Sequence, residues 1–580
     1  MPLTPVLEVI RQSPVVLWEG RSPRDVDVDT SDGQVRPLLE ILRRRLREEW
    51  GLVLLTYSRA TGLVWDTPDL QAQNVREPVR QALTAFHLLD PAGEAFVAED
   101  PARFFRAAYE LLRVPSAVPW PDGRPLRFTI LVEFGDHILP HEAASMSDEE
   151  MRAAEWVSLL ASSLAMRRHG HRLVLYTPDA GRVDPLVRAS IPTVRLPQPD
   201  RTAKARFIEA LRRLYPNART EEGLDWDLVA RLSANTPNIS MVDLMASGEP
   251  INRAQLVKRR ARDVAAISEG MLVPMEEPPE ELYGRSIRRA QALLARIAER
   301  LRRGDPDAPH NILLAGPPGS GKTALVQWLA RQSGVPAYRV HSPKHSLVGE
   351  TERRSRLLFE LLLEWAPSIG FIDEITEAFP TERPELDLDA GASRAVVAAM
   401  LAYLGDERRR GRTLLIAATN CPWRMGAALR SRFVVIPVLS PPADDYPAIV
   451  AGLARRILGL DVSPDDPAVQ EAAQAFYDRA ASPRHIIKAM SNVRLAADGG
   501  GPDLIRRAAQ TFCGDTAPEA VALADLWAVH LTDCLEFLPW WQDPQYPLPP
   551  HLQGAVRPDG SIDRRELQRR IEELSGRVRM

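Results

Sequence analysis

The sequence predicts an α/β fold in which helices flank a parallel sheet, and this prediction is centred on one glycine-rich loop. An apolar run at 311–315 is typical of a buried strand. It leads into Gly-Pro-Pro-Gly-Ser-Gly-Lys-Thr at 316–323, and residues 324–329 have the composition of a helix. Strand, glycine-rich loop and helix in this order are the context of a phosphate-binding loop. The sequence therefore predicts the fold class together with a nucleoside triphosphate site.

Each part of this loop has a chemical role in that interpretation. The glycines let backbone N–H groups surround the phosphates, and the helix N-terminus adds a favourable dipole. Lys322 is expected to reach the β- and γ-phosphates, and the Thr323 hydroxyl to hold Mg²⁺. The predicted cofactors are ATP and Mg²⁺. The residues expected to bind the nucleotide are Gly316, Pro317, Pro318, Gly319, Ser320, Gly321, Lys322, Thr323 and Ala324.

The bulk properties predict a soluble protein with several compact parts. A chain of 580 residues is too long for one core, and we expect roughly three or four units. The formal net charge of −4 gives no general reason to expect nucleic acid or an anionic membrane as a partner. We find no leader-like N-terminus and no apolar run approaching ~18 residues. A cytoplasmic protein without a membrane segment is the expectation.

The first half of the chain repeats this order of elements without its chemistry. Strands are predicted at 14–20 and 52–57, with a helix at 35–50 between them. The loop at 19–33 contains no Gly-Lys-Thr. Its carboxylates would repel a triphosphate, and they are Asp25, Asp27, Asp29 and Asp32.

Further strands are predicted at 128–134 and 172–176, before a helical part. Residues 203–215 and 224–267 are predicted to be wholly helical. We therefore expect an α/β domain followed by a small helical lid.

Near-constant spacings indicate an internal repeat. Three pairs of motifs are separated by 240, 241 and 242 residues, and a duplicated domain explains such spacings. The first copy lacks the loop lysine, has Phe134 where a second carboxylate is expected, and has Ser190 in place of Arg432. It is interpreted as a non-hydrolysing scaffold or docking domain. The pairs are Glu133 and Asp373, Asp179 and Asn420, and Arg188 and Arg430.

A basic amphipathic helix is predicted at about 286–301, after a proline- and glutamate-rich linker. Its arginines could contact nucleic acid, but a solvated or subunit-facing surface is favoured because no aromatic residues interleave. These arginines are Arg288, Arg289, Arg296, Arg300, Arg302 and Arg303.

An acidic pair supplies the second half of the predicted ATPase chemistry. The strand at 369–372 ends in Asp373 and Glu374, and Asp373 lies 51 residues after Lys322. Asp373 is expected to bind Mg²⁺, directly or through water. Glu374 is expected to orient and deprotonate the attacking water.

Three motifs together carry a family resemblance. They are Leu347–Glu352, Ala366–Ile375 and Ala418–Asn420, and they resemble the AAA clade of AAA+ ATPases. That clade contains the cell-division-cycle segregases, proteasomal ATPases and metalloprotease unfoldases. The resemblance covers residues 283–500 and, more loosely, 10–267. With a degenerate first domain, the chain is similar to tandem AAA proteins of the plastid and cyanobacterial type.

The resemblance implies roles for further residues. Asn420 resembles sensor 1, which helps to position the lytic water. Arg430 and Arg432 fall where the family keeps arginine fingers, and the sequence leaves open which of the two acts. Arg484 stands at the sensor 2 position, where the most similar clade usually has a small residue. Tyr283 and Gly284 resemble the linker that lies against adenine.

Two loops resemble segments that face a central pore. Leu347 and Val348 match the loop that grips polypeptide, although an aliphatic pair offers less flat contact area than an aromatic one. The alternative is a loop that only packs or binds a fixed partner. A second pore loop or a solvated loop is expected at Glu382, Glu385, Asp387 and Asp389.

The C-terminal part is predicted to be helical. A lid is expected first, followed by a tail with an aromatic cluster at 537–541, which is either a packing anchor against the lid or a partner-docking motif. The predicted organisation is a degenerate AAA-like domain at 1–200, its lid at 201–270, a linker at 271–285, an active AAA+ domain at 286–440, a lid at 441–498 and a C-terminal extension at 499–580.

The predicted function is an ATP-hydrolysing AAA+ ring motor, expected as a homo-hexamer, that remodels, unfolds or disassembles a protein partner. Two alternatives remain open. One is an ATP-dependent assembly switch or chaperone without threading. The other, less favoured, is a nucleic-acid clamp or loader.

Overall fold

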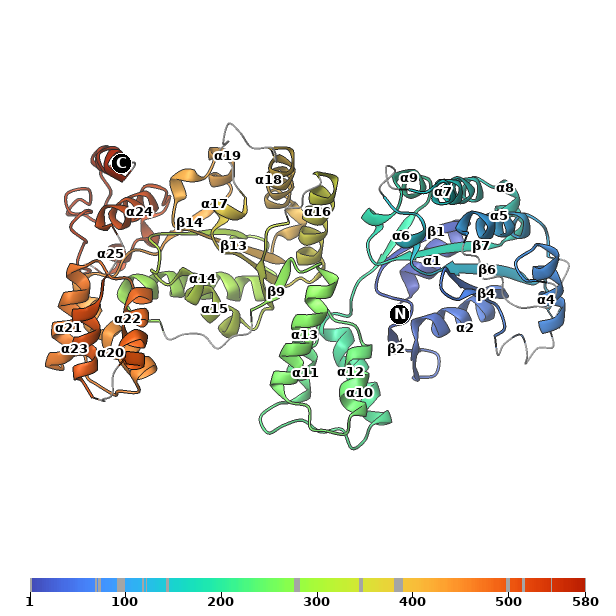
Figure 1. Ribbon diagram of the computed structural model, residues 1–580, viewed down its shortest axis with the longest axis horizontal. Helices are drawn as coiled ribbons and strands as arrows, with labels where there is room; N and C mark the ends of the chain where they lie inside the picture. Colours follow the sequence, from blue (N-terminus) through green and yellow to red (C-terminus); the bar gives the residue numbers. More distant parts are fainter. Residues whose placement is uncertain are drawn as a thin grey trace. The chain divides into compact units, whose positions relative to one another are not determined.

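Both halves of the chain are built on a six-stranded sheet, as the computed structural model shows (Figure 1). The chain divides into two units, Met1–Asp263 and Val264–Met580. The structure describes residues 3–578 apart from 68–69, 71–74, 91–99, 117–118, 121–122, 142–145, 276–281, 344–347, 380–389, 497–500, 514–516 and 544. Within these described residues, no helix combines the length and the apolar character needed to cross a membrane.

The sheet of the first unit has the strand order β5-β4-β6-β7-β1-β8. All neighbouring strands are parallel except β4 and β5, which are antiparallel. The strands are β1 (Val15–Gly20), β4 (Leu52–Ser58), β5 (Gly62–Val64), β6 (Arg127–Val132), β7 (Arg172–Thr177) and β8 (Thr193–Leu196).

Helices cover both faces of this sheet because successive strand residues point to opposite sides. In β1, Val15 and Leu17 join one hydrophobic cluster, and Val16 and Trp18 join the other. The first face is covered by α4 (Arg76–Ala85), α5 (Pro101–Leu112), α7 (Asp148–Ala161) and α8 (Leu164–His169). The second face is covered by α1 (Thr4–Gln12) and α2 (Leu38–Trp50).

A bundle of short helices follows the first sheet. The prediction that 224–267 is wholly helical is wrong, because the chain leaves the helix twice. Pro237 interrupts it once, and Gly248, at a φ of 73°, together with Pro250 interrupts it again. The helices are α10 (Arg201–Leu214), α11 (Trp226–Leu232), α12 (Ile239–Ala246) and α13 (Arg253–Ile267).

The sheet of the second unit has the order β14-β10-β13-β12-β11-β9. Only β9 runs antiparallel to its neighbour, and it lies within the segment predicted to be a linker. The predicted α/β class, with parallel strands flanked by helices, is therefore confirmed. The strands are β9 (Leu272–Pro274), β10 (Asn311–Ala315), β11 (Ala337–Val340), β12 (Ser368–Ile372), β13 (Thr413–Thr419) and β14 (Val434–Pro437).

The five parallel strands have the same order in both sheets. Taken in chain order, the fifth strand lies beside the first, followed by the fourth, third and second. A closely packed glycine stands at the end of the first strand in both sheets. A Cβ atom added to Gly20 would lie 2.6 Å from the Leu196 carbonyl oxygen, and a Cβ atom added to Gly316 would lie 2.0 Å from the Val438 carbonyl oxygen. This common topology supports the repeat inferred from the sequence.

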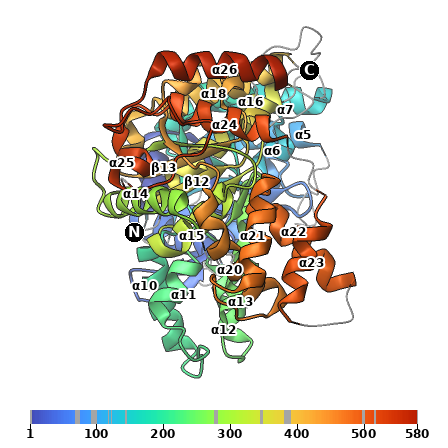
Figure 2. The same cartoon turned by 90° about the vertical axis from the view of Figure 1, so that its left-hand side faces the viewer.

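In the second unit, the P-loop helix packs on one face of the sheet and the C-terminal tail on the other (Figure 2). The first face carries α14 (Arg285–Arg302) and α15 (Lys322–Ser333). The second carries α16 (Val348–Glu364), α18 (Ala390–Leu404), α24 (Pro518–His530) and α26 (Arg564–Val578). A separate cluster joins α20 (Tyr446–Leu458), α21 (Pro467–Asp478), α22 (Pro483–Ala496) and α23 (Asp503–Thr511), which form the helical lid.

Part of the aromatic cluster of the tail is a packing anchor, as one of the two expectations held, but at another place. Trp540, in α25 (Pro539–Gln542), is buried in the same hydrophobic cluster as Leu313 and Leu415 of the sheet. Its indole N–H donates to the Gly560 carbonyl at 3.1 Å. Trp540 therefore anchors the tail on the sheet rather than on the lid, whereas Trp541 is 39% exposed.

Candidate active site

The glycine-rich loop lies between the end of β10 and the start of α15, as predicted. Gly316 sits against the chain after β14, where any side chain would collide with the Val438 carbonyl. Gly319, at a φ of 78°, faces the lid: an added Cβ would lie 2.4 Å from Ser482 Oγ, just before α22. The Val438 main chain at Gly316 and the Ser482 side chain at Gly319 therefore leave room only for glycine, and they bring the segment after β14 and the lid to the loop.

Lys322 lies inside this loop and is buried. Its ammonium group donates to the carbonyls of Gly316 and Pro317, both at 2.8 Å, and to Asn420 Oδ1 at 2.7 Å. Burial lowers the pKa of Lys322 to about 8, while nearby carboxylates oppose this shift. The lysine is thus a buried donor already directed at the loop interior. The opposing carboxylates are Glu374, Asp373 and Asp525.

The two predicted magnesium ligands lie together. Thr323 Oγ1 donates to Asp373 Oδ2 at 3.2 Å, and Asp373 is exposed at the end of β12. A hydroxyl and a carboxylate are hard oxygen ligands, which Mg²⁺ prefers. The residues present therefore fit a magnesium ion that also contacts phosphates.

Glu374 is held by four donors from two chain segments. Its Oε1 accepts from the hydroxyls of Thr376 at 2.7 Å and Thr419 at 2.8 Å. Its Oε2 accepts from the backbone N–H of Asn420 at 3.0 Å and the side-chain N–H of Asn420 at 2.7 Å. Asn420 thereby connects Glu374 to Lys322. No role was predicted from the sequence for Thr376 or Thr419. The only signal was their position in the sequence, near Glu374 and Asn420 respectively.

The two arginines proposed as fingers lie on another part of the unit. Arg430 is the last residue of α19 (Ala427–Arg430), and Arg432 is exposed beside Gly405. Among the hydrogen bonds of the described residues, none joins either arginine to the group around Lys322. Residues that act on a neighbouring subunit are expected to lie away from the loop of their own chain.

The remaining site residues contact the lid. Arg484 is exposed near the start of α22, and its charge lowers the pKa of Lys322. The ring of Tyr283 packs over Gly452 of α20, where an added Cβ would lie 2.2 Å from Tyr283 Cζ. Gly284, at a φ of 107°, lies against Asp445. The linker therefore meets the lid near the loop.

Parts of the predicted pore loops fall outside the described residues. This applies to Leu347 and to the acidic residues at 382–389, while Val348 begins α16.

The arginines of α14 are largely occupied by ion pairs, which leaves less charge for nucleic acid. Arg289 pairs with Glu536, Arg300 with Asp305, and Arg302 and Arg303 with Glu299.

In the first unit, a hairpin replaces the glycine-rich loop. The strands β2 (Val26–Val28) and β3 (Val35–Pro37) pair antiparallel between β1 and α2. Arg24, which precedes the hairpin, donates to both oxygens of Glu133, from Nε at 3.1 Å and from Nη2 at 2.7 Å. Its guanidinium also lies 5.5 Å from the ring centre of Phe134. A fixed cation therefore covers the two positions that correspond to Asp373 and Glu374.

Asp25 of the same segment binds the helical bundle. Its carboxylate accepts from Arg21 at 2.6 Å and from the backbone N–H groups of Asn238 at 3.1 Å and Ile239 at 2.8 Å. The negative charge of Asp25 is thus compensated by donors of the first unit itself, which was not predicted from the sequence. Lys204 is fully buried nearby and donates to the Thr236 carbonyl at 2.7 Å.

A P-loop lysine, a strand-end Asp-Glu pair and an asparagine at the end of the adjacent strand define a P-loop ATPase site, and the strand order and helical lid place it in the AAA+ class. Residues 312–439 match the family model of the ATPase family associated with various cellular activities (AAA). The second unit therefore contains an AAA ATPase domain.

Curated relatives are similar to part of this chain. The chain is 37% identical over 126 residues to the cell division cycle protein 48 homolog of Archaeoglobus fulgidus, covering 21% of this chain and 17% of that protein. It is 40% identical over 124 residues to the ATPase family gene 2 protein of Schizosaccharomyces pombe, covering 21% and 15%. A protein of Methanothermobacter marburgensis, titled a putative 26S proteasome regulatory subunit homolog, is 37% identical over 167 residues, covering 27% and 44%. The chain thus matches less than half the length of each of these proteins.

Proposed function

We propose that this chain is an ATP-hydrolysing AAA+ ring motor, assembled as a hexamer, that remodels, unfolds or disassembles a protein partner. The observation that carries the proposal is the hydrogen-bonded connection from Lys322 through Asn420 to Glu374. It links the phosphate-binding side chain to the proposed base. Relatives named for the proteasome and for cell division support a protein partner.

The site residues divide the work of hydrolysis. Lys322 binds phosphate oxygens, and the Thr323 hydroxyl and Asp373 carboxylate hold Mg²⁺, which neutralises phosphate charge. Glu374 accepts a proton from the attacking water, and the threonine hydroxyls keep its carboxylate in place. Asn420 positions the water, and an arginine from a neighbouring subunit, Arg430 or Arg432, completes the site.

The first unit is proposed as a non-hydrolysing domain for docking or assembly. Its hairpin has no lysine equivalent to Lys322, and Phe134 stands in place of a base. The ion pair between Arg24 and Glu133 supports this role, since a cation from the chain itself occupies the carboxylate.

The experiment is ATP turnover by the full chain with Glu374→Gln. Turnover should be lost while ATP binding remains, because the phosphate contacts are untouched. The matched control is Glu133→Gln, at the equivalent strand end of the first unit, which should retain turnover. Persistent hydrolysis in Glu374→Gln would contradict the assignment of the base. Gel filtration with ATP should show an assembly, and a species that stays monomeric would contradict the ring.

An assembly switch without threading is the second candidate. It is favoured by the aliphatic Leu347 and Val348, which offer a threaded chain less contact area than aromatic residues. Replacing both with alanine separates the two models: a motor should lose client processing, whereas a switch should keep it.

A further inference from the structure

The C-terminal tail supplies a buried carboxylate at the edge of the ATPase site. Asp525 lies in α24 and is 0% exposed. It accepts from the backbone N–H of Ser440 at 3.0 Å, from the Ser440 hydroxyl, and from His551 Nε2 at 3.1 Å. A buried carboxylate is tolerated only when donors of this kind compensate for its lost hydration. The tail and Ser440 are therefore held together strongly.

Ser440 belongs to the hinge between the sheet and the lid. The hinge, residues 438–442, follows β14 and leads towards α20. One end of it abuts the P-loop, because the Val438 carbonyl lies against Gly316. The other end is held by Asp525 through Ser440. The hinge is thus in contact with the nucleotide-binding loop on one side and with the tail on the other.

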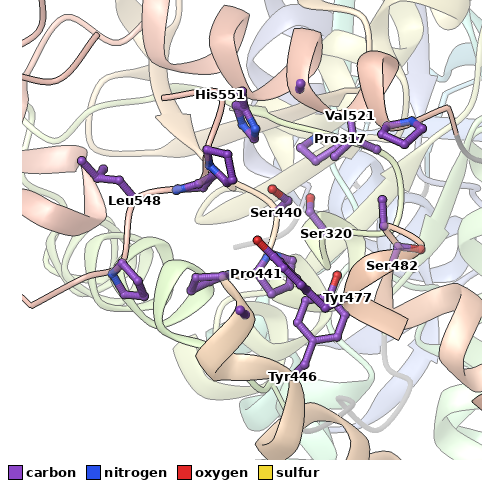
Figure 3. A pocket seen from close by; sticks show the side chains of 18 of the residues that line it. Pro317, Ser320, Ser440, Pro441, Tyr446, Tyr477, Ser482, Val521, Leu548 and His551 are labelled. Carbon is purple, nitrogen blue, oxygen red and sulfur yellow. The ribbon is translucent and has the colours of Figure 1, made fainter. Parts of the chain in front are cut away.

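A cavity of about 460 Å³ lies at this junction (Figure 3). The loop contributes Pro317 and Ser320, and the hinge contributes Ser440. The lid contributes Tyr446 and Ser482, and the tail contributes His551. The cavity is thus bounded by the loop, the hinge, the lid and the tail, and a movement of the lid would change its shape.

We propose that Asp525 is a positioning residue of the ATPase, which fixes the hinge at Ser440 and thereby sets how the lid closes on the P-loop. The C-terminal tail is then a working part of the nucleotide site of its own chain. This inference rests on the proposed ATP hydrolysis by the second unit. Asp525 acts through the hinge and is distinct from the residues that contact ATP.

The test compares Asp525→Asn with wild type in steady-state ATP hydrolysis by the full chain. Asparagine keeps the size of the side chain but loses the charge that holds both Ser440 donors. Lid closure should become less favourable, so KM for ATP should rise about tenfold while kcat stays within about twofold, because Glu374 and Asn420 are unchanged. A merely structural role would instead reduce the active fraction, lowering apparent kcat at unchanged KM, and would overturn the proposal.

Two further variants make the result decisive. Ser440→Ala removes the hydroxyl that donates to Asp525 and should also raise KM for ATP. This variant tests the proposal even if Asp525→Asn does not fold. Asp559→Asn is the control in the same tail, since Asp559 is exposed and bonds Ser561 within its own turn, and its KM should equal that of wild type. An unchanged KM in Ser440→Ala and in folded Asp525→Asn overturns the inference but leaves the ATPase proposal intact. A wild-type chain without hydrolysis would instead overturn the proposed function itself.

Discussion

Phe134 and Glu374 occupy the same left-handed backbone position in two sheets of equal strand order. Their φ angles are 59° and 53°, and each directly precedes a four-residue helix, α6 (Gly135–Ile138) or α17 (Ile375–Ala378). Left-handed geometry is unfavourable for both side chains. In the second unit it directs the proposed base towards Asn420, whereas in the first unit it presents a phenyl ring to Arg24. The backbone of a catalytic turn thus persists where its carboxylate is missing.

The first prediction concerns the number of nucleotide sites. Lys322→Ala should abolish ATP binding by the whole chain, because the first unit has no equivalent lysine and its acidic position is already paired with Arg24. Equilibrium binding of a fluorescent ATP analogue should give one site per wild-type chain and none in the variant. One remaining site in Lys322→Ala would show that the first unit binds nucleotide.

The second prediction concerns the support of the base. Thr419→Val removes a 2.8 Å hydrogen bond to Glu374 and should lower kcat about tenfold, with KM nearly unchanged. Thr177→Val is the matched control, because Thr177 ends the equivalent strand β7 and bonds only within its own turn region, to the Asp179 carbonyl at 3.0 Å. Equal rates for both variants would exclude a positioning role for Thr419.

The third prediction concerns Asp25. Asp25→Asn should destabilise the first unit by about 2 kcal/mol, since the buried Arg21 loses one of its two carboxylate partners and keeps only Asp27. Hydrogen exchange should rise at the Asn238 and Ile239 amides, which donate to this carboxylate. Asp32→Asn is the control, because Asp32 lies in the same loop but is partly exposed. Unchanged hydrogen-exchange protection of the two amides would contradict a stabilising role for the bonds between Asp25 and these two residues.

The fourth prediction concerns pH. Burial lowers the pKa of Lys204 to about 7, whereas an unfolded lysine titrates near 10.5. Between these values the unfolded chain binds more protons, so stability should rise with pH from about 7 to about 10.5 and should be independent of this group below about 7. The slope from this group approaches about 1.4 kcal/mol per pH unit. Denaturant unfolding of wild type and Lys204→Met between pH 7 and 9 should show this slope only in wild type.

The sequence was informative wherever a local pattern determines structure. Apolar runs located the parallel strands, and the spacing from Lys322 to Asp373 placed the P-loop near the acidic pair. The roles assigned to individual site residues stay predictions. Contacts between distant segments were not predictable: Thr419 lies in the Ala418–Asn420 motif but its bond to Glu374 depends on the fold, and Asp525 stands in no motif. Likewise, four aspartates in one loop suggested repulsion, while their compensation by Arg21 and by helix α12 depends on the fold.

The pairing of Arg24 with Glu133 has a consequence for the conformational freedom of the first unit. The guanidinium is covalently attached to the chain, so its bidentate bond to Glu133 requires no nucleotide. The first unit should therefore keep one shape while the second passes through its cycle. The first unit would then present the same surface in every nucleotide state of the second.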